Sequence, residues 1–187
     1  TSDVVIAISS SDTGEATVTS ALTFTSANWD TAQTVTVTGA DDDLVDGTVA
    51  STITVSVDDA NSDDDFDGVA DQTVTASTTD DDVAGFTITE TEGSTTVTEA
   101  GSTDTFDVVL NAQPDSNVVL TISSSDTGES TVHGSTPSNN TITFTSANWD
   151  TPQAFTVTGV DDDLVDGTVS STATVSVVDA VSDNNFD

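Results

Sequence analysis

The sequence contains no lysine and no arginine, although it is 187 residues long and has 34 aspartate and glutamate residues. Its formal net charge is therefore -34, and no lysine or arginine ion pair can form within the chain. Nucleic-acid binding is not expected, because affinity for the phosphate backbone comes largely from lysine and arginine. An anionic membrane surface would also repel the chain. Lysine Schiff-base chemistry and the lysine-containing P-loop are excluded as well.

Cysteine is absent too, which excludes disulfides, thiol catalysis and cysteine metal ligands. The chain must therefore be stabilised by packing, by hydrogen bonds or by a cation from outside. Hydrophobic residues make up only 34% of the sequence, and this value combined with the high net charge is typical of disordered proteins.

The order of the hydrophobic residues argues against disorder. They alternate with threonine and serine in short runs, and no segment has a helical period. A period of two with β-branched residues is typical of a strand that is buried on one face and solvated on the other. The sequence therefore predicts an all-β protein, with the clearest strands at Thr34–Thr38, Ile53–Val57, Phe86–Thr89, Thr141–Phe144 and Phe155–Thr158.

Long segments of the sequence occur twice. The spacing between the two occurrences is about 114 residues in the first segment and about 120 residues in the later ones. A period of this length is too long for a solenoid unit and fits one antiparallel β-sandwich domain per copy, with Trp29 and Trp149 in the two hydrophobic cores. The repeated pairs are Ile8–Glu15 with Ile122–Glu129, Thr23–Thr31 with Thr143–Thr151, and Asp41–Val49 with Asp161–Val169.

The predicted domains are residues 1–82 and residues 83–187. The first copy lacks a counterpart of the strands between Phe86 and Leu110, and the second lacks a counterpart of the strand Gln72–Ser77. One interpretation is that the chain is part of a longer tandem array. The other is a subunit that completes its sandwiches with strands from neighbouring subunits. No hydrophobic run is long enough for a signal peptide or a transmembrane helix, so we expect targeting signals to lie outside this segment.

Acidic residues are concentrated where the strand patterns stop. Clustered carboxylates repel one another, so a bound cation would stabilise them. Ca²⁺ is the predicted cation, because it takes six to eight oxygen ligands in flexible geometry. Residues 63–68 also form a D-x-D-x-D-G pattern like the opening of an EF-hand loop, although its twelfth position is Val74 and not glutamate. The alternative is that these acidic loops only keep the protein soluble.

Five sequence elements resemble those of Calx-β domains, especially the tandem Calx-β-like repeats of giant bacterial surface and adhesin proteins. These elements are Phe86–Glu90, Val97–Gly101, the strand Thr141–Phe144, Gly159–Asp166 and Thr78–Asp82. The resemblance implies a seven-stranded immunoglobulin-like sandwich that binds Ca²⁺ at one end, between an acidic loop and the acidic run at the end of the domain. It implies as ligands Asp41, Asp42, Asp46 and Asp80 to Asp82 in the first copy, and Glu90, Asp161, Asp162 and Asp166 in the second. Positions 46 and 166 hold aspartate where the family more often has glutamate.

The sequence therefore predicts one set of candidate calcium ligands. The set is Asp41, Asp42, Asp43, Asp46, Asp63, Asp65, Asp67, Asp80, Asp81, Asp82, Glu90, Asp161, Asp162, Asp163 and Asp166. Glu15 and Glu129 are predicted to be turn residues, and His133, the only imidazole, is predicted to have no metal or catalytic role. Both tryptophans are expected to pack in a core rather than to stack on sugars. No catalytic residues are predicted, and we expect the protein not to be an enzyme.

The leading functional hypothesis is an extracellular or cell-surface calcium-binding spacer in an elongated array of a large bacterial adhesin-type protein, with roles in adhesion or biofilm. An acidic run at the boundary between the copies would let calcium stiffen the array. A second hypothesis is a self-assembling filament or surface-layer subunit joined by strand exchange between identical subunits. A third is a glycan-binding module, which predicts exposed indole rings. The expected partners are neighbouring copies or identical subunits, and a surface glycan or protein at the far end of the array.

Overall fold

The computed structural model describes residues 2–187. All pairs of named strands in this part of the chain are antiparallel, and its helices are short 3-10 turns. The predicted all-β fold is therefore confirmed. The chain divides into two compact units, one made of the described residues up to Asp42 with Asp46–Asp81, the other of Asp43–Val45 with Asp82–Asp187. None of the helices in residues 2–187 is long and hydrophobic enough to cross a membrane.

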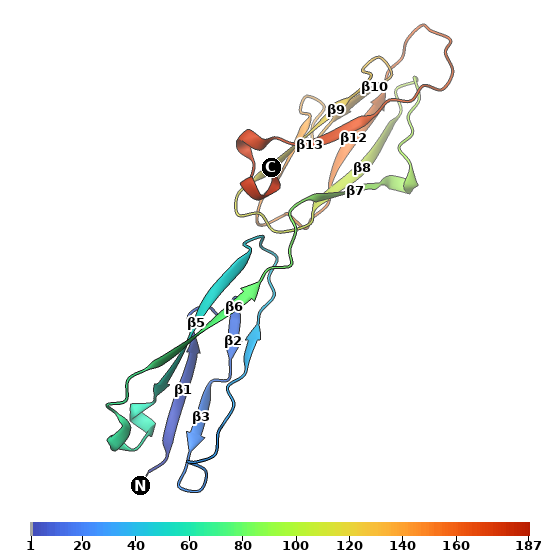
Figure 1. Ribbon diagram of the computed structural model, residues 1–187. Helices are drawn as coiled ribbons and strands as arrows, with labels where there is room; N and C mark the ends of the chain where they lie inside the picture. Colours follow the sequence, from blue (N-terminus) through green and yellow to red (C-terminus); the bar gives the residue numbers. More distant parts are fainter. Residues whose placement is uncertain (1) are drawn as a thin grey trace. The chain divides into compact units, whose positions relative to one another are not determined.

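The first unit contains two sheets (Figure 1). The larger sheet has the strand order β3-β1-β5-β6, and the smaller one consists of β2 and β4 alone. Two 3-10 turns, η1 (Asp59–Asn61) and η2 (Asp64–Phe66), follow β5. The strands are β1 (Val4–Ser10), β2 (Ala16–Val18), β3 (Ala21–Phe24), β4 (Val37–Gly39), β5 (Thr48–Val57) and β6 (Gln72–Thr79).

The second unit also has two sheets, with the orders β10-β12-β8-β7 and β11-β9-β13. Three 3-10 turns complete it: η3 (Thr91–Gly93), η4 (Asp179–Val181) and η5 (Asn184–Phe186). The strands are β7 (Phe86–Glu90), β8 (Thr103–Leu110), β9 (Val118–Ser124), β10 (Ser130–His133), β11 (Thr141–Phe144), β12 (Gln153–Gly159) and β13 (Ala173–Val177).

The hydrophobic core of the second unit lies between its two sheets. Phe106 and Phe155 come from the sheet that contains β8 and β12, and their rings are 5.8 Å apart. Leu120 and Phe144 come from the other sheet and are fully buried in the same cluster. This arrangement is consistent with a β-sandwich, and the alternation of hydrophobic and polar residues along each strand explains it.

The first unit has a much smaller core. Among its described hydrophobic residues only Ile8, Ala16 and Ile53 are buried. Trp29 is 72% exposed, so the prediction that it packs in a core is wrong. Trp149, its counterpart in the second copy, does pack against the core of its unit. The difference arises because β8, whose residues fill the core of the second unit, has no counterpart among the strands of the first.

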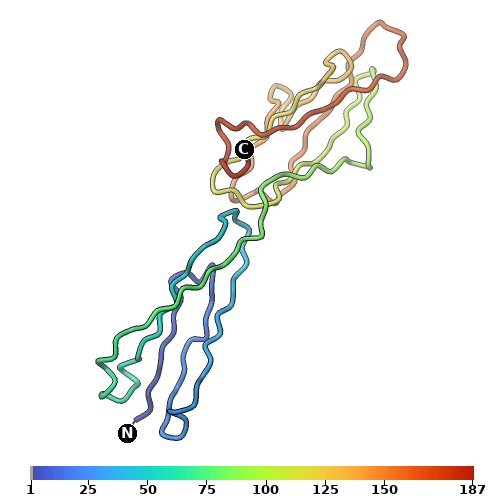
Figure 2. The backbone as a smooth tube through the Cα atoms, in the orientation of Figure 1, coloured from blue at the N-terminus to red at the C-terminus, as the bar shows by residue number. Residues whose placement is uncertain are grey.

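The same difference shortens one of the predicted strands. The sequence predicts a strand at Thr34–Thr38, but β4 begins only at Val37. Figure 2 traces residues 25–36 as a path that turns after β3 and runs back along the unit. The equivalent β12 has seven residues and pairs with β8 along most of its length. Among the described residues of the first unit no counterpart of β8 pairs with this segment, and it forms a strand over only three residues, paired with β2.

Candidate metal centre

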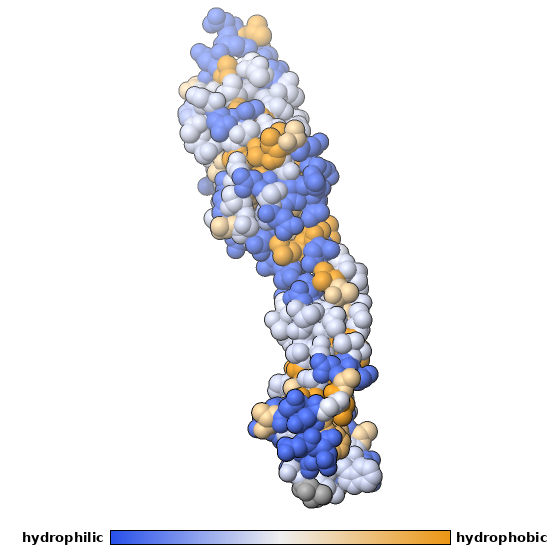
Figure 3. Space-filling model, turned by 90° about the vertical axis from the view of Figure 1, so that its left-hand side faces the viewer, coloured by the Kyte–Doolittle hydropathy of each residue, from blue (hydrophilic) through white to orange (hydrophobic). Residues whose placement is uncertain are grey.

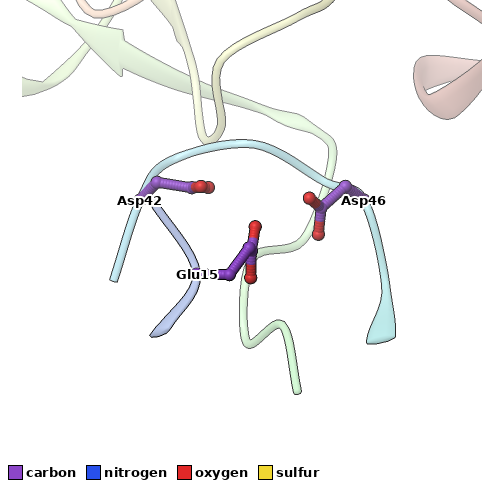
Figure 4. Close-up of side chains that lie close together, drawn as sticks. All are labelled: Glu15, Asp42 and Asp46. Carbon is purple, nitrogen blue, oxygen red and sulfur yellow. The ribbon is translucent and has the colours of Figure 1, made fainter. Parts of the chain in front are cut away.

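Three carboxylates of the first unit lie close enough together to hold one ion. They belong to Glu15, Asp42 and Asp46, and one oxygen of each lies within 4.8 Å of the others. Figure 4 shows the three side chains pointing toward one another. Asp42 and Asp46 are exposed, and Glu15 is the least exposed of the three. Oxygen ligands on loops are the type that Ca²⁺ prefers.

The second unit contains the same arrangement. Its members are Glu129, Asp162 and Asp166, again with carboxylate oxygens within 4.8 Å of one another. These residues are the sequence counterparts of Glu15, Asp42 and Asp46. We call the two groups the first and the second acidic cluster. Among residues 2–187, no other group of three or more acidic, histidine or cysteine side chains meets this distance criterion.

The glutamate of each cluster follows a tight turn. In the first copy, Asp12 Oδ1 accepts a hydrogen bond from the Gly14 backbone N–H at 3.0 Å. The Ala16 N–H then donates to the Asp12 carbonyl, also at 3.0 Å. Such an Asx turn is the reason that aspartate and glycine are favoured at these positions. The second copy repeats the turn with Asp126 and Gly128 at the same 3.0 Å distance.

Strand pairing brings this turn to the acidic loop. Glu15 directly precedes β2, which pairs with β4 so that Ala16 lies opposite Gly39. The Ala40 N–H donates to the Glu15 carbonyl at 2.8 Å. The loop that carries Asp42 and Asp46 begins at that point, so the register of the β2–β4 pair fixes the glutamate beside the two aspartates. In the second unit β10 and β12 pair in the same way, and Val160 N–H donates to the Glu129 carbonyl at 2.9 Å.

The clusters are electrostatically unfavourable without a cation. The pKa of Glu15 is raised by burial and then by the negative charges of Asp46, Asp42 and Asp12. The pKa of Glu129 is raised by burial and then by Asp166, Asp162, Asp126 and Glu99. No lysine or arginine exists in the chain to offset these charges. A divalent cation would reverse this effect, because it favours the ionised carboxylates.

Asp80 stabilises the acidic loop of the first unit through hydrogen bonds to its backbone. Its Oδ2 accepts hydrogen bonds from the backbone N–H groups of Asp46 and Gly47, at 3.0 and 2.9 Å. Gly47 has a φ of 80°, a conformation that favours glycine. Asp80 therefore holds the loop in the shape that directs Asp46 into the first acidic cluster.

The structure brings together only part of the predicted ligand set. Asp42 and Asp46 join the first cluster, and Asp162 and Asp166 join the second. Asp41 and Asp43 belong to the same loop as the first pair, and Asp161 and Asp163 to the same loop as the second, but these four lie outside the clusters. The acidic run Asp80 to Asp82 also lies outside them among the described residues, with Asp80 acting on the loop backbone as described.

The D-x-D-x-D-G pattern forms a capped 3-10 turn. Asp63 caps the 3-10 turn η2, and its carboxylate accepts hydrogen bonds from the N–H groups of Ser2 and Asp65 at 2.8 and 3.2 Å. These bonds lower the pKa of Asp63. Asp183 caps η5 in the second copy in the same way, with asparagines in place of the next two aspartates. The pattern is therefore a capped turn, and Asp63, Asp65 and Asp67 do not form a close carboxylate group in the described chain.

Glu90 also lies apart from the second cluster. It ends β7, and its Oε1 accepts a hydrogen bond from Thr95 Oγ1 at 3.2 Å. The residue that contributes to the negative environment of Glu129 is instead Glu99, from the segment Val97–Gly101. The assignment of Glu90 as a partner of Asp162 and Asp166 is therefore not supported.

Glu15 and Glu129 lie in turns, as the sequence predicts, but sequence reasoning missed them as members of the acidic clusters. The signal that could have found them is the duplication, since the acidic loop and the S-S-D-T-G-E segment are both kept in the two copies. In the first copy, Glu15 and the start of the acidic loop are about 26 residues apart in the sequence. Only the pairing of β2 with β4 shows that they are neighbours.

Comparison of the chain with protein-family models, with curated proteins and with solved structures gave no match.

Proposed function

We propose that this protein is a non-enzymatic, calcium-binding structural module of a large extracellular or cell-surface protein, where it serves as a spacer. The observation that carries the proposal is the recurrence of one carboxylate group, Glu-Asp-Asp, in equivalent loops of both units. A chain of net charge -34 without lysine or arginine needs external cations to relieve such clusters. The resemblance of the acidic loop to that of Calx-β domains favours the same ion.

Calcium suits these loops better than magnesium does. Mg²⁺ requires nearly ideal octahedral geometry, whereas Ca²⁺ accepts a flexible shell of carboxylate and carbonyl oxygens and water. Each cluster offers three carboxylates on loop and turn segments, two of which are exposed in the first unit. Few protein ligands and high exposure favour weak binding, which fits the high calcium concentrations outside cells.

Several features support a structural and not a catalytic role. The only histidine, His133, places its Nδ1 within 2.9 Å of the neighbouring Gly134 carbonyl oxygen, and it belongs to neither acidic cluster. The sequence has no cysteine or lysine nucleophile. Asp80, at the boundary between the two copies in the sequence, holds the loop of the first acidic cluster, so a cation in that cluster would order the residues that lead into the second copy.

The proposal is tested by thermal unfolding of the whole chain in calcium, in magnesium and in chelator. A ligand that binds only the folded state stabilises it by about 2.7 kcal/mol at a concentration 100 times its Kd. For units of this size, this corresponds to a rise of roughly 10–20 °C in Tm. Fluorescence reads the units separately in Trp149→Phe and Trp29→Phe backgrounds, because Trp29 belongs to the first unit and Trp149 to the second.

Matched variants separate the clusters from general charge effects. Asp46→Asn is expected to abolish the calcium-dependent shift of the first unit alone, and Asp166→Asn that of the second. Asp41→Asn removes the same charge from the same loop but should keep most of the shift, since Asp41 lies outside the cluster. Asp30→Asn serves as a control outside the acidic loop. Equal melting curves in calcium and chelator for the unmodified chain would leave only the solubilising role for the acidic loops.

A further inference from the structure

The first unit leaves uncovered a hydrophobic face that the second unit buries. The face forms a groove of about 640 Å³ beside β1 and β3. Its hydrophobic lining consists of Val4, Ile6, Phe24, Trp29, Val57, Phe66 and Val69. We call it the open groove. Hydrophobic surface is also visible on the first unit in the lower part of Figure 3.

The residues that line the open groove have buried counterparts in the second copy. Val118, Leu120 and Phe144 correspond to Val4, Ile6 and Phe24, and all three are fully buried. Phe186 corresponds to Phe66 and is 7% exposed, compared with 44% for Phe66. The sequence of this face is thus that of a protein core, although the first unit exposes it.

The second unit shows what covers this face. Phe106, Val108 and Leu110 of β8 belong to the same buried cluster as Val118, Leu120 and Phe144. Ala112, just after β8, is also in the cluster. The cover therefore comes from the hairpin β7–β8, which has no counterpart among the described residues of the first unit.

The segment of the first unit that corresponds to β12 forms a strand only over its last three residues. In the second unit, β12 pairs with β8 so that Phe155 lies opposite Phe106 and Gln153 opposite Val108. The counterparts of Phe155 and Gln153 are Val35 and Gln33, which precede β4 and lie in no strand. Both copies have valine at the next alternate position, Val37 and Val157, and threonine directly before it. The sequence around Val35 is therefore compatible with a longer strand, which would form if a strand equivalent to β8 paired with it.

We propose that the open groove of the first unit binds a β-hairpin with the side-chain pattern of residues 83–116, which adds as the missing edge strands. The binding mode is β-strand addition, in which main-chain hydrogen bonds give affinity and alternate side chains fill the groove. The hairpin has to be an additional copy of this segment. The hairpin of each chain already fills its own second unit, so a transfer between two identical chains would uncover one face for each face that it covers.

The groove chemistry fits this occupant. The hairpin presents Phe106, Val108 and Leu110 on one face, and these positions carry no charge. Burying an acidic residue in this groove would be costly, since the chain has no lysine or arginine to pair with it. The occupant is therefore a strand with uncharged hydrophobic residues at alternate positions. Calcium is not needed for this interaction, because both acidic clusters lie outside the lining of the groove.

The test uses the full chain and a synthetic peptide of residues 83–116 from its own sequence. Titration calorimetry is expected to give one peptide bound per chain, in calcium and in chelator alike. Hydrogen exchange should slow at the amides of Gln33 and Val35 when the peptide binds, because they join a ladder, whereas the Thr36 N–H already donates to Thr19 Oγ1. Calcium-dependent stabilisation without peptide binding would overturn this inference and leave the proposed function intact. Peptide binding without calcium-dependent stabilisation would support this inference and overturn the proposed function.

Engineered cysteines report the site and the register, because the natural chain has none. Gln33→Cys is expected to form a disulfide with a Val108→Cys peptide, as the Gln153–Val108 pair predicts. The yield should fall by at least about tenfold with a Val109→Cys peptide, whose side chain points to the other face. Gln153→Cys in the second unit is the matched control, and it should not react because its own β8 occupies that edge.

Charge substitutions complete the test. Val37 is 42% exposed, whereas its counterpart Val157 is 5% exposed beside β8. Val37→Asp should weaken peptide binding at least about tenfold, because it places an unpaired carboxylate in the new core. Thr34→Asp is the control, since position 34 and its counterpart Ala154 are both exposed. Absence of binding at millimolar peptide would overturn the inference, as would self-association of the chain that the peptide does not inhibit.

Discussion

Phe24 and Phe144 provide a matched pair that tests the difference between the two units. The same residue stands in equivalent strands, β3 and β11, but Phe144 is fully buried and Phe24 is only partly buried at the open groove. Substituting a fully buried phenylalanine by alanine costs about 3–5 kcal/mol, because hydrophobic contacts are lost and a cavity remains. At Phe24 no closed cavity can form, so we expect Phe24→Ala to cost less than about 2 kcal/mol.

Urea unfolding measures this difference in each unit. The Trp149 fluorescence of a Trp29→Phe background follows the second unit, and the Trp29 fluorescence of a Trp149→Phe background follows the first. With an m-value of about 1–2 kcal/mol/M, Phe144→Ala should lower the midpoint of the second unit by roughly 1.5–5 M. At the same m-value, Phe24→Ala should lower the midpoint of the first unit by less than about 1–2 M. Equal losses at the two positions would refute the conclusion that the first face is open.

Three further predictions follow from the electrostatics. Calcium affinity should fall as the pH decreases through the raised pKa values of Glu15 and Glu129, because protons then compete with calcium for the ligand oxygens. Glu15→Gln should flatten this pH dependence for the first unit. Calcium titrations at several pH values measure both effects. In the calcium-free protein, lowering the pH should instead increase folding stability. The folded-state pKa values of the two glutamates are raised, so protonation of the folded protein relieves an unfavourable charge. Thermal melts in chelator at a series of pH values check this sign, with Glu15→Gln as the control. Asp183→Ala should destabilise the second unit by about 1–3 kcal/mol in the same urea assay, because its buried carboxylate accepts hydrogen bonds from the Ser116 and Asn185 N–H groups at 2.7 and 3.0 Å. The control is Asp179→Ala, which changes an exposed residue and should be nearly neutral.

A scattering experiment tests the spacer function. If calcium restricts the joint between the two copies, small-angle X-ray scattering should give a narrower distribution of particle dimensions in calcium than in chelator. An identical profile in both conditions would contradict the role of calcium in stiffening the chain.

Much of the fold could be predicted from the sequence because the signals are local. Alternation of hydrophobic and threonine residues predicts strands such as β7 and β11 within one residue of their bounds. The duplication predicts that the acidic loops of both copies behave alike, and Asp42, Asp46, Asp162 and Asp166 do occupy equivalent clusters. These features depend on side-chain period and on repeated segments, which the linear order of residues contains in full.

The remaining features depend on contacts between residues that are distant in the sequence. Glu15 and Glu129 enter the clusters only through the registers of the β2–β4 and β10–β12 pairs, and Glu90 is left out for the same reason. Trp29 and Trp149 have nearly identical local sequences, yet one is exposed and the other packs against a core. The sequence by itself determined which residues could form strands, turns and ligands. The tertiary structure decided which of them are neighbours and which are covered, because burial depends on the strand that lies opposite and not on the residue alone.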